Sequence, residues 1–182
     1  MIIEDYQLIW QIKKGDKQAF DILVRKHYQN IYSYCLRRVG NQVVAADLTQ
    51  DIFLKLVKAI YNFRFSGKFT NFLFTIAVNT CNDYYKKPQQ SYVDVNSLQK
   101  SDGKPEPIES IVRNEEARAI KKKLDVLPDI QKDTLILYYY HDLKAKDIAK
   151  ITGVSLATVK SRLKQGKDKL KKMLSEEDYF ER

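Results

Sequence analysis

Apolar residues recur every three to four positions along most of this chain, and that spacing restricts it to helices. Asp16 and Asn41 are each suited to cap a helix N-terminus, and a run of apolar residues at i, i+3, i+4 and i+7 follows each of them. A third such run begins at Phe69. Because no segment alternates with the period of two that marks a half-buried strand, the sequence predicts an all-α protein.

The three runs also predict which side of each helix faces a core. The expected core residues are Phe20, Leu23, Val24, His27, Ile31, Tyr34 and Cys35 in the first helix, Leu48, Ile52, Phe53, Leu56, Val57 and Ile60 in the second, and Phe69, Phe72, Leu73, Ile76, Ala77 and Tyr84 in the third. In the C-terminal part the core candidates are Leu124, Leu127, Leu135 and Leu137, with an interruption at Pro128.

A different kind of segment separates these two helical parts. Residues 88–110 hold three of the four prolines in the 182 residues and have no apolar period. The simplest interpretation is a linker over 88–114 that joins two small helical domains, residues 1–87 and 115–182. An ordered active-site loop is the alternative for this segment.

Composition excludes several classes of protein. No run approaches the roughly 18 apolar residues of a membrane span, and the acidic N-terminus is unlike a secretion signal. Two cysteines and two histidines form neither a disulfide framework nor a zinc site. We therefore expect a cytoplasmic protein without a metal or cofactor. Its net charge of +9 suggests a polyanionic partner.

Residues 146–163 have the layout of a helix-turn-helix. Gly153 supplies the positive φ of the turn, Ser155 is placed to cap the second helix, and Val159 and Leu163 can anchor it. The surrounding stretch 144–173 carries ten basic and two acidic side chains. Candidate base contacts are Thr158, Ser161 and Arg162, and candidate phosphate contacts are Lys160, Lys164, Lys167 and Lys169. A solvated lysine face on a small bundle is the alternative.

The N-terminal part has two polar faces of its own. One is an amide-rich stripe of Asn71, Thr75, Asn79, Asn82 and Lys86, preceded by a loop with Phe65, Lys68 and Phe69 that could hold unpaired bases. The other is a patch of acidic and amide side chains within this otherwise basic domain: Asp47, Gln50, Asp51 and Lys55. Such a patch suggests a protein partner rather than DNA. For each face, an ordinary solvated helix surface is the alternative.

Taken in order, these segments resemble the extracytoplasmic-function (ECF) sigma factors of bacterial RNA polymerase. The segments that resemble the family are residues 15–21 (GDKQAFD), 47–53 (DLTQDIF), 69–84 and 127–170. The resemblance implies that Asp47, Gln50, Asp51 and Phe53 belong to the polymerase interface, with Phe53 packed inside the bundle. It implies that Asn79 and the loop from Phe65 to Phe69 act at the melted −10 element, and that Lys160, Ser161, Arg162 and Lys164 read the −35 element. Its implied partners are core RNA polymerase, promoter DNA and an anti-sigma protein, often anchored in the membrane.

Three departures from the family pattern stand out. Phe72 lies near a position where the family usually has tryptophan. Gln165-Gly166-Lys167 lies where the family commonly has Arg-Ala-Arg. Gly166 is expected to weaken its helix by about 1 kcal/mol relative to alanine. The first helix of the motif begins at Lys144-Ala145, without a good capping residue.

The function predicted from these features is promoter recognition as a subunit of RNA polymerase. The alternative is a conventional helix-turn-helix repressor or activator, which would bind duplex DNA tightly as a free dimer. Enzymatic activity is not expected, because His27 and His141 lie in different predicted domains and no carboxylate pair has an accompanying base or metal ligand.

Overall fold

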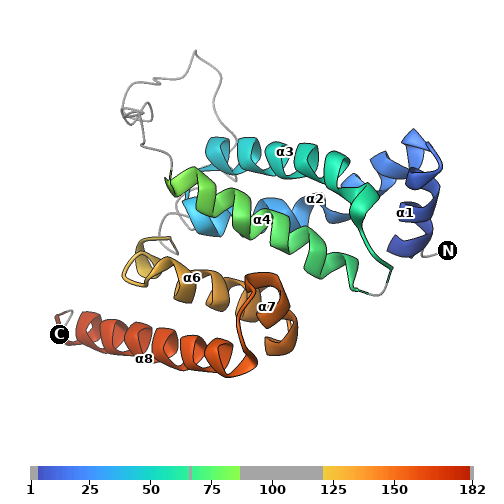
Figure 1. Ribbon diagram of the computed structural model, residues 1–182. Coiled ribbons are helices and arrows are strands. Elements are labelled where there is room, and N and C mark those ends of the chain that lie inside the picture. Colours follow the sequence, from blue (N-terminus) through green and yellow to red (C-terminus); the bar gives the residue numbers. More distant parts are fainter. Residues whose placement is uncertain (1–3, 66, 87–120, 181–182) are drawn as a thin grey trace, which may run out of the picture.

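The structure, a computed structural model, describes residues 4–65, 67–86 and 121–180, and within these ranges every regular element is a helix (Figure 1). The predicted all-α class is confirmed. The segment expected to be a linker, 88–114, lies outside the described residues, as do the nearest ends of the two expected domains.

Over residues 4–65 and 67–86 the N-terminal part is a bundle of four helices. These are α1 (Asp5–Lys13), α2 (Lys17–Val39), α3 (Gln42–Ala59) with a short 3-10 turn η1 (Ile60–Asn62), and α4 (Phe69–Lys86). Both predicted caps form: the Asp16 carboxylate accepts from two backbone N–H groups at 2.9 and 3.1 Å, and the Asn41 side chain accepts from that of Val44 at 3.1 Å. Between them Gly40 ends α2 with a φ of +68°.

The inner face of α3 differs from the prediction at one position. Leu48, Ile52, Phe53, Leu56 and Ile60 are buried as expected. Val57, however, is 42% exposed, so its prediction as a core residue was wrong. The buried stripe already passes through Leu56 and Ile60, which leaves Val57 turned toward the outer side of the helix.

In its described residues the C-terminal part contains α6 (Asp129–Leu135), which continues into a π-helical turn η3 (Ile136–Tyr140), then α7 (Ala145–Thr152) and α8 (Leu156–Phe180). The four predicted core leucines are all buried. The helix-turn-helix also forms as predicted: Gly153 has a φ of +67°, and the Ser155 hydroxyl accepts from the Thr158 backbone N–H at 3.1 Å. Lys144 gives α7 no side-chain cap, again as expected.

Gly166 has a packing role that its low helix propensity concealed. It is buried in α8, and a Cβ placed on it would lie 2.8 Å from Cδ1 of Leu135 in α6. A methyl group does not fit at that distance, so glycine permits the close approach of the two helices.

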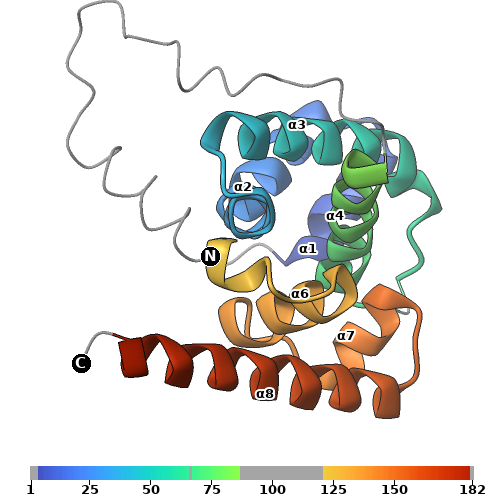
Figure 2. The same cartoon turned by 90° about the vertical axis from the view of Figure 1, so that its left-hand side faces the viewer.

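The two parts of the chain pack directly against each other. In both views α6 and α7 lie between α8 and the N-terminal bundle (Figures 1 and 2). The ring of His141 lies 4.9 Å from that of Phe74 and 6.0 Å from that of Tyr34, measured between centroids. Tyr34 and Arg38 of α2 both donate to the Asp133 carboxylate of α6 at 2.8 Å. The expected domains therefore share a buried interface.

None of the helices in the described ranges has both the length and the apolar composition needed to cross a membrane. Over the same residues no three side chains of the metal-binding types gather into a possible ion site. Cys35 and Cys81 are both buried and not joined in a disulfide.

Candidate functional site

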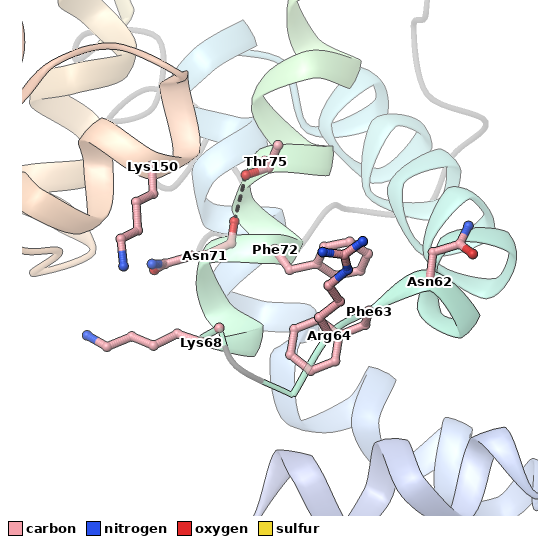
Figure 3. A pocket seen from close by; sticks show the side chains of 9 residues that line it. Asn62, Phe63, Arg64, Lys68, Asn71, Phe72, Thr75 and Lys150 are labelled. Carbon is pink, nitrogen blue, oxygen red and sulfur yellow. Dashed lines mark hydrogen bonds between the residues drawn. The ribbon is translucent and has the colours of Figure 1, made fainter.

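A pocket of about 320 Å³ lies where the η1–α4 loop meets the start of α4 (Figure 3). Its lining residues are Asn62, Phe63, Arg64, Gly67, Lys68, Asn71, Phe72, Thr75 and Lys150. All but the last come from the N-terminal part; Lys150 reaches it from α7. The pocket falls within the size range typical of sites for small ligands.

The lining of this pocket combines aromatic rings with positive charge. The rings of Phe63 and Phe72 lie 5.2 Å apart between centroids. Phe63 is only 5% exposed and supports Phe72 from the core, whereas Phe72 is half-buried and is the ring available to a ligand. Arg64, Lys68 and Lys150 are its charged lining residues, and none of the lining residues that the structure describes is a carboxylate. Rings that stack on a flat group, beside cations that hold phosphate, are the combination that proteins use to bind single-stranded nucleic acid.

Helix α1 holds the loop that forms one wall of the pocket. The Lys13 ammonium donates to the Phe63 carbonyl at 2.8 Å, and the Tyr6 hydroxyl donates to the Gly67 carbonyl at 3.0 Å. The ring of Tyr6 also stacks on that of Phe63. Sequence reasoning missed this role of α1, because no motif in residues 5–13 signals it, and it also missed Phe63 and Arg64.

The predicted amide stripe is only partly open. Asn79 and Lys86 are exposed, and Asn82 is half-buried and accepts from Arg38 at 3.4 Å. Asn71 is only 8% exposed, because α7 covers this end of α4. Thr75 is half-buried and donates to the Asn71 carbonyl at 2.8 Å.

Of the two loop aromatics, only one is placed to meet a partner. Phe65 is 47% exposed, although it does not line the pocket. Phe69 is 2% exposed and packs edge-on against His27 in the core. The expectation that Phe69 contacts bases was therefore wrong in this arrangement, since the first residue of α4 points inward.

Asp147 of α7 connects the two halves of the site. Its Oδ2 lies 2.7 Å from the Lys68 ammonium, and its Oδ1 accepts from the Asn71 amide at 3.0 Å. A little further along, the Thr75 hydroxyl lies 3.5 Å from the Ile151 carbonyl. The start of α7 thus sits on the face of α4 that the sequence assigned to the −10 element.

The candidate reading residues belong to α8, and this helix lies on the opposite side of the molecule from α3 (Figure 2). Lys160, Ser161 and Lys164 are exposed there, and Thr158 and Arg162 are half-buried. Opposite them Val159 is fully buried, as predicted, and Leu163 packs partly against the core. The predicted contacts are therefore brought together on one side of one helix.

The acidic-amide patch lies on the outer side of α3. Asp47, Gln50 and Asp51 are exposed, and Asp51 pairs with Lys55 at 3.2 Å. Phe53 is 7% exposed and stacks on Tyr28, so it supports the helix from inside, as the resemblance implied. Sequence reasoning missed two apolar neighbours on the outer side, Val43 at 69% and Leu54 at 64% exposed. Val43 lies four residues before Asp47, and Leu54 lies four residues after Gln50. Residues four apart share a helix face, so this spacing was the signal that places them beside the polar patch.

Curated relatives match nearly the whole chain. The chain is 30% identical to the ECF RNA polymerase sigma factor SigW of Bacillus subtilis over 177 residues, which cover 91% of this chain and 94% of that protein. The chain belongs to the ECF family of sigma factors. It is also 30% identical to the ECF sigma-E factor of Escherichia coli, over 88% of this chain and 89% of that protein, and 28% identical to the sigma-H factor of Pseudomonas aeruginosa, over 94% of each.

Two family models match separate parts of this sigma factor. Sigma-70 region 2 matches residues 23–91, and Sigma-70 region 4 matches residues 117–170. Helix α1 lies before the first match. As an ECF sigma factor, the protein is a non-enzymatic transcription initiation factor that binds core RNA polymerase and promoter DNA.

Solved structures share the fold of this sigma factor. CnrH in complex with the cytosolic domain of CnrY has a TM-score of 0.73 at 21% identity, over 94% of this chain and 97% of that one. RpoE of Bartonella quintana, in complex with the anti-sigma factor NepR, has a TM-score of 0.65 at 22% identity, over 86% and 96%. In both cases the covered share spans the N- and C-terminal parts together.

Proposed function

We propose that the pocket of Phe63, Phe72 and Lys68 captures an unpaired base of the −10 element when this sigma factor opens a promoter. The observation that carries the proposal is the described lining of this pocket, in which the half-buried ring of Phe72 lies beside three cations and none of the described residues is a carboxylate. Extruding a base costs a few kcal/mol of stacking and pairing energy, and stacking on a ring inside the pocket offsets that cost. The proposed domain for this step is residues 1–87, followed by a linker over 88–114.

The exposed part of α4 extends this proposed site. Asn79 lies two turns along the helix from Asn71, and its amide is free of the α7 cover. An amide can donate and accept at once, so it can read the edge of an unpaired base. We assign Asn79 to −10 base preference, and Phe65, Asn82 and Lys86 to contacts at the edges of the same strand.

The second promoter element is assigned to α8 of the proposed domain 115–182. The N-terminal half of a recognition helix reads base edges, and flanking lysines bind phosphates. By this division Thr158, Ser161 and Arg162 face bases of the −35 element, and Lys160 and Lys164 face its backbone. The capped start of α8 at Ser155 gives this half of the helix a defined position.

The outer side of α3 is the proposed docking surface for core polymerase. Asp47, Gln50 and Asp51 supply polar contacts, and Val43 and Leu54 add exposed apolar area one turn before and one turn after them along the helix. Protein interfaces combine exposed apolar side chains with polar contacts. Leu54→Asp is therefore expected to weaken polymerase binding at least tenfold, while the exposed change leaves the fold intact.

Base capture can be tested with promoter fragments that carry 2-aminopurine at successive −10 positions, bound to holoenzyme. A flipped base loses stacking and becomes fluorescent, so one position is expected to brighten on opening. Phe72→Leu keeps an apolar side chain but removes the ring, and should reduce both this signal and open-complex formation. Tyr139→Ala, an exposed aromatic change in η3, is the matched control. Full brightening with Phe72→Leu would refute the assignment of the pocket.

Base preference has its own test. Asn79→Ala should change which −10 sequences are transcribed and leave polymerase binding unaltered, since Asn79 is outside the α3 surface. Run-off transcription from a library of −10 variants measures the preference. An equal loss on every promoter would contradict a reading role.

We also infer that this sigma factor acts in the cytoplasm and is held by an anti-sigma protein, which a membrane anchor could tether. Support comes from CnrH and RpoE, both solved with a protein partner. A partner that masks the α3 surface must compete with core polymerase. Purified candidate partner and core enzyme should therefore exclude each other in a binding assay, and a stable ternary complex would contradict the inference.

A further inference from the structure

The placement of Asp147 is unusual for an acidic residue. It is one of only two acidic residues in the basic stretch 144–173, and it is 3% exposed. Its position in the first turn of α7 suits an acid, because the helix dipole favours negative charge there. Its carboxylate nevertheless bonds across the domain boundary, to Lys68 and Asn71.

The contacts of this carboxylate are those of an anion in a binding site. One oxygen pairs with an ammonium at 2.7 Å, and the other accepts from an amide at 3.0 Å. Both donors line the mouth of the pocket, where Figure 3 shows Lys68, Asn71 and Lys150 on one side and Phe72 and Arg64 on the other. The hydrogen bond from Lys68 holds the pKa of Asp147 below its ordinary value despite burial, so the carboxylate is charged at neutral pH.

We propose that the Asp147 carboxylate occupies the place of a backbone phosphate of the melted −10 strand. While α7 packs on α4, Asp147 therefore competes with promoter DNA for Lys68 and Asn71. A phosphate oxygen accepts from an ammonium and an amide as a carboxylate oxygen does. The inference rests on the proposed function of the pocket, because it identifies which part of the nucleotide each group binds. The ring of Phe72 holds the base, and the Lys68–Asn71 pair holds the phosphate.

An independent set of contacts holds α6, the helix that precedes α7, against the N-terminal part. At the other end of the interface Arg38 is fully buried and pairs with Asp133 at 2.8 Å and with Asp129 at 3.0 Å. Since both ends of the interface are closed by polar bonds, α7 covers α4 as part of a defined arrangement. The Lys68 side chain stays 58% exposed, but Asn71 is covered. A phosphate can therefore replace Asp147 against both groups together only when α7 has left, so the free chain binds the strand with an affinity reduced by the fraction of molecules in which α7 has left.

The test is fluorescence anisotropy of the full chain with a labelled single-stranded DNA of mixed sequence, which probes the phosphate contact without base readout. Asp147→Asn should raise affinity about tenfold by freeing Lys68. The slope of log K against log salt should become more negative by about 0.7, the value for one added phosphate contact on a single strand. Asp147→Glu keeps the charge and should stay near wild type.

Two controls separate competition from general charge. Asp21→Asn makes the same change at an exposed position of α2, and should alter affinity far less. Lys68→Met combined with Asp147→Asn should cancel the gain, since the freed cation is then missing. An equal gain from Asp21→Asn, or a gain that survives Lys68→Met, would overturn the proposal.

A measurement on holoenzyme distinguishes this inference from the proposed function. Suppose that Lys68→Met slows promoter opening while Asp147→Asn leaves the affinity of the free chain for single-stranded DNA unchanged. The proposal that Asp147 takes the place of a phosphate is then wrong, and the assignment of the pocket stands. If Lys68→Met leaves opening unaffected, Lys68 holds no phosphate and the assignment of this part of the pocket fails with it. Thermal unfolding of each variant by circular dichroism verifies that the folded state is retained.

Discussion

Arg38 of α2 donates its Nε hydrogen to Asp133 of α6 at 2.8 Å, and both side chains are almost completely buried. The Tyr34 hydroxyl donates to the same carboxylate oxygen at 2.8 Å. Burial alone would lower the pKa of Arg38, but the nearby Asp133 charge raises it above its ordinary value, so the guanidinium stays charged. Two residues 95 positions apart in sequence thus join region 2 to region 4.

Arg38→Met should weaken this interface strongly. The change leaves Asp133 buried without its cation, and breaking such a pair costs about 3–5 kcal/mol unless the groups regain water. Separation of the two parts restores that water, so we expect a larger radius of gyration in small-angle scattering and a second transition in urea unfolding. Arg25→Met, at an exposed position of the same helix, is the matched control. A single transition at the wild-type midpoint would show that the pair does not hold the parts together.

Acidification should loosen the same interface through His141. Burial first, and the nearby Arg37 charge second, lower its pKa from 6.5 to about 4. Between about pH 4 and pH 6.5 the His141 side chain therefore binds a proton in the unfolded chain but not in the folded chain. As a result, the free energy of unfolding falls as the pH decreases from 6.5 toward 4. At pH 5 the loss from this group is about 2 kcal/mol.

The difference between wild type and His141→Phe isolates that contribution. The phenyl ring keeps the packing against Phe74 and Tyr34 but cannot titrate. Urea unfolding at pH 7.5 and at pH 5.0 should give a smaller drop for the variant than for wild type. Identical drops would mean that other groups account for the acid sensitivity.

Gly166→Ala should destabilise this protein, although alanine is the better helix former. The added methyl would lie 2.8 Å from Cδ1 of the buried Leu135, and overpacking of this kind costs about 1–3 kcal/mol. That cost exceeds the roughly 1 kcal/mol gained in helix propensity. Chemical denaturation measures the balance. Adding Leu135→Val makes room for the methyl, so the double variant should recover part of the loss; a more stable single variant would contradict the argument.

Lys164→Ala should weaken binding to −35 duplexes of any sequence by a similar factor. A lost phosphate contact reduces the salt dependence of log K by about 0.9 per phosphate on duplex DNA, and it does not alter base choice. Binding of holoenzyme to fragments with different −35 elements, over a range of salt, gives both quantities. Lys17→Ala, an exposed lysine at the start of α2, should leave the slope unchanged. A sequence-selective loss with Lys164→Ala would point instead to a base contact.

Local signals predicted the helices well, because each depends on residues within a few positions. Asp16, Asn41 and Ser155 cap helices where their side chains suggested, and Gly153 makes the turn. The apolar spacing identified the core of each part with few errors. Val57 was one, since a period of 3.6 leaves the edge of a stripe ambiguous over the last turn of a helix.

The amino-acid order alone thus determined an all-α protein of the ECF family, its helix-turn-helix and the acidic side of α3, because caps, turns and helical periods are local. Only the tertiary structure decided which polar residues are free to bind. Asn71 looks exposed along α4, yet α7 buries it, and Gly166 looks unfavourable until Leu135 is placed against it. Asp147 likewise meets Lys68 across 79 positions of sequence. Such contacts depend on how two folded parts pack, and no spacing within either part contains that information.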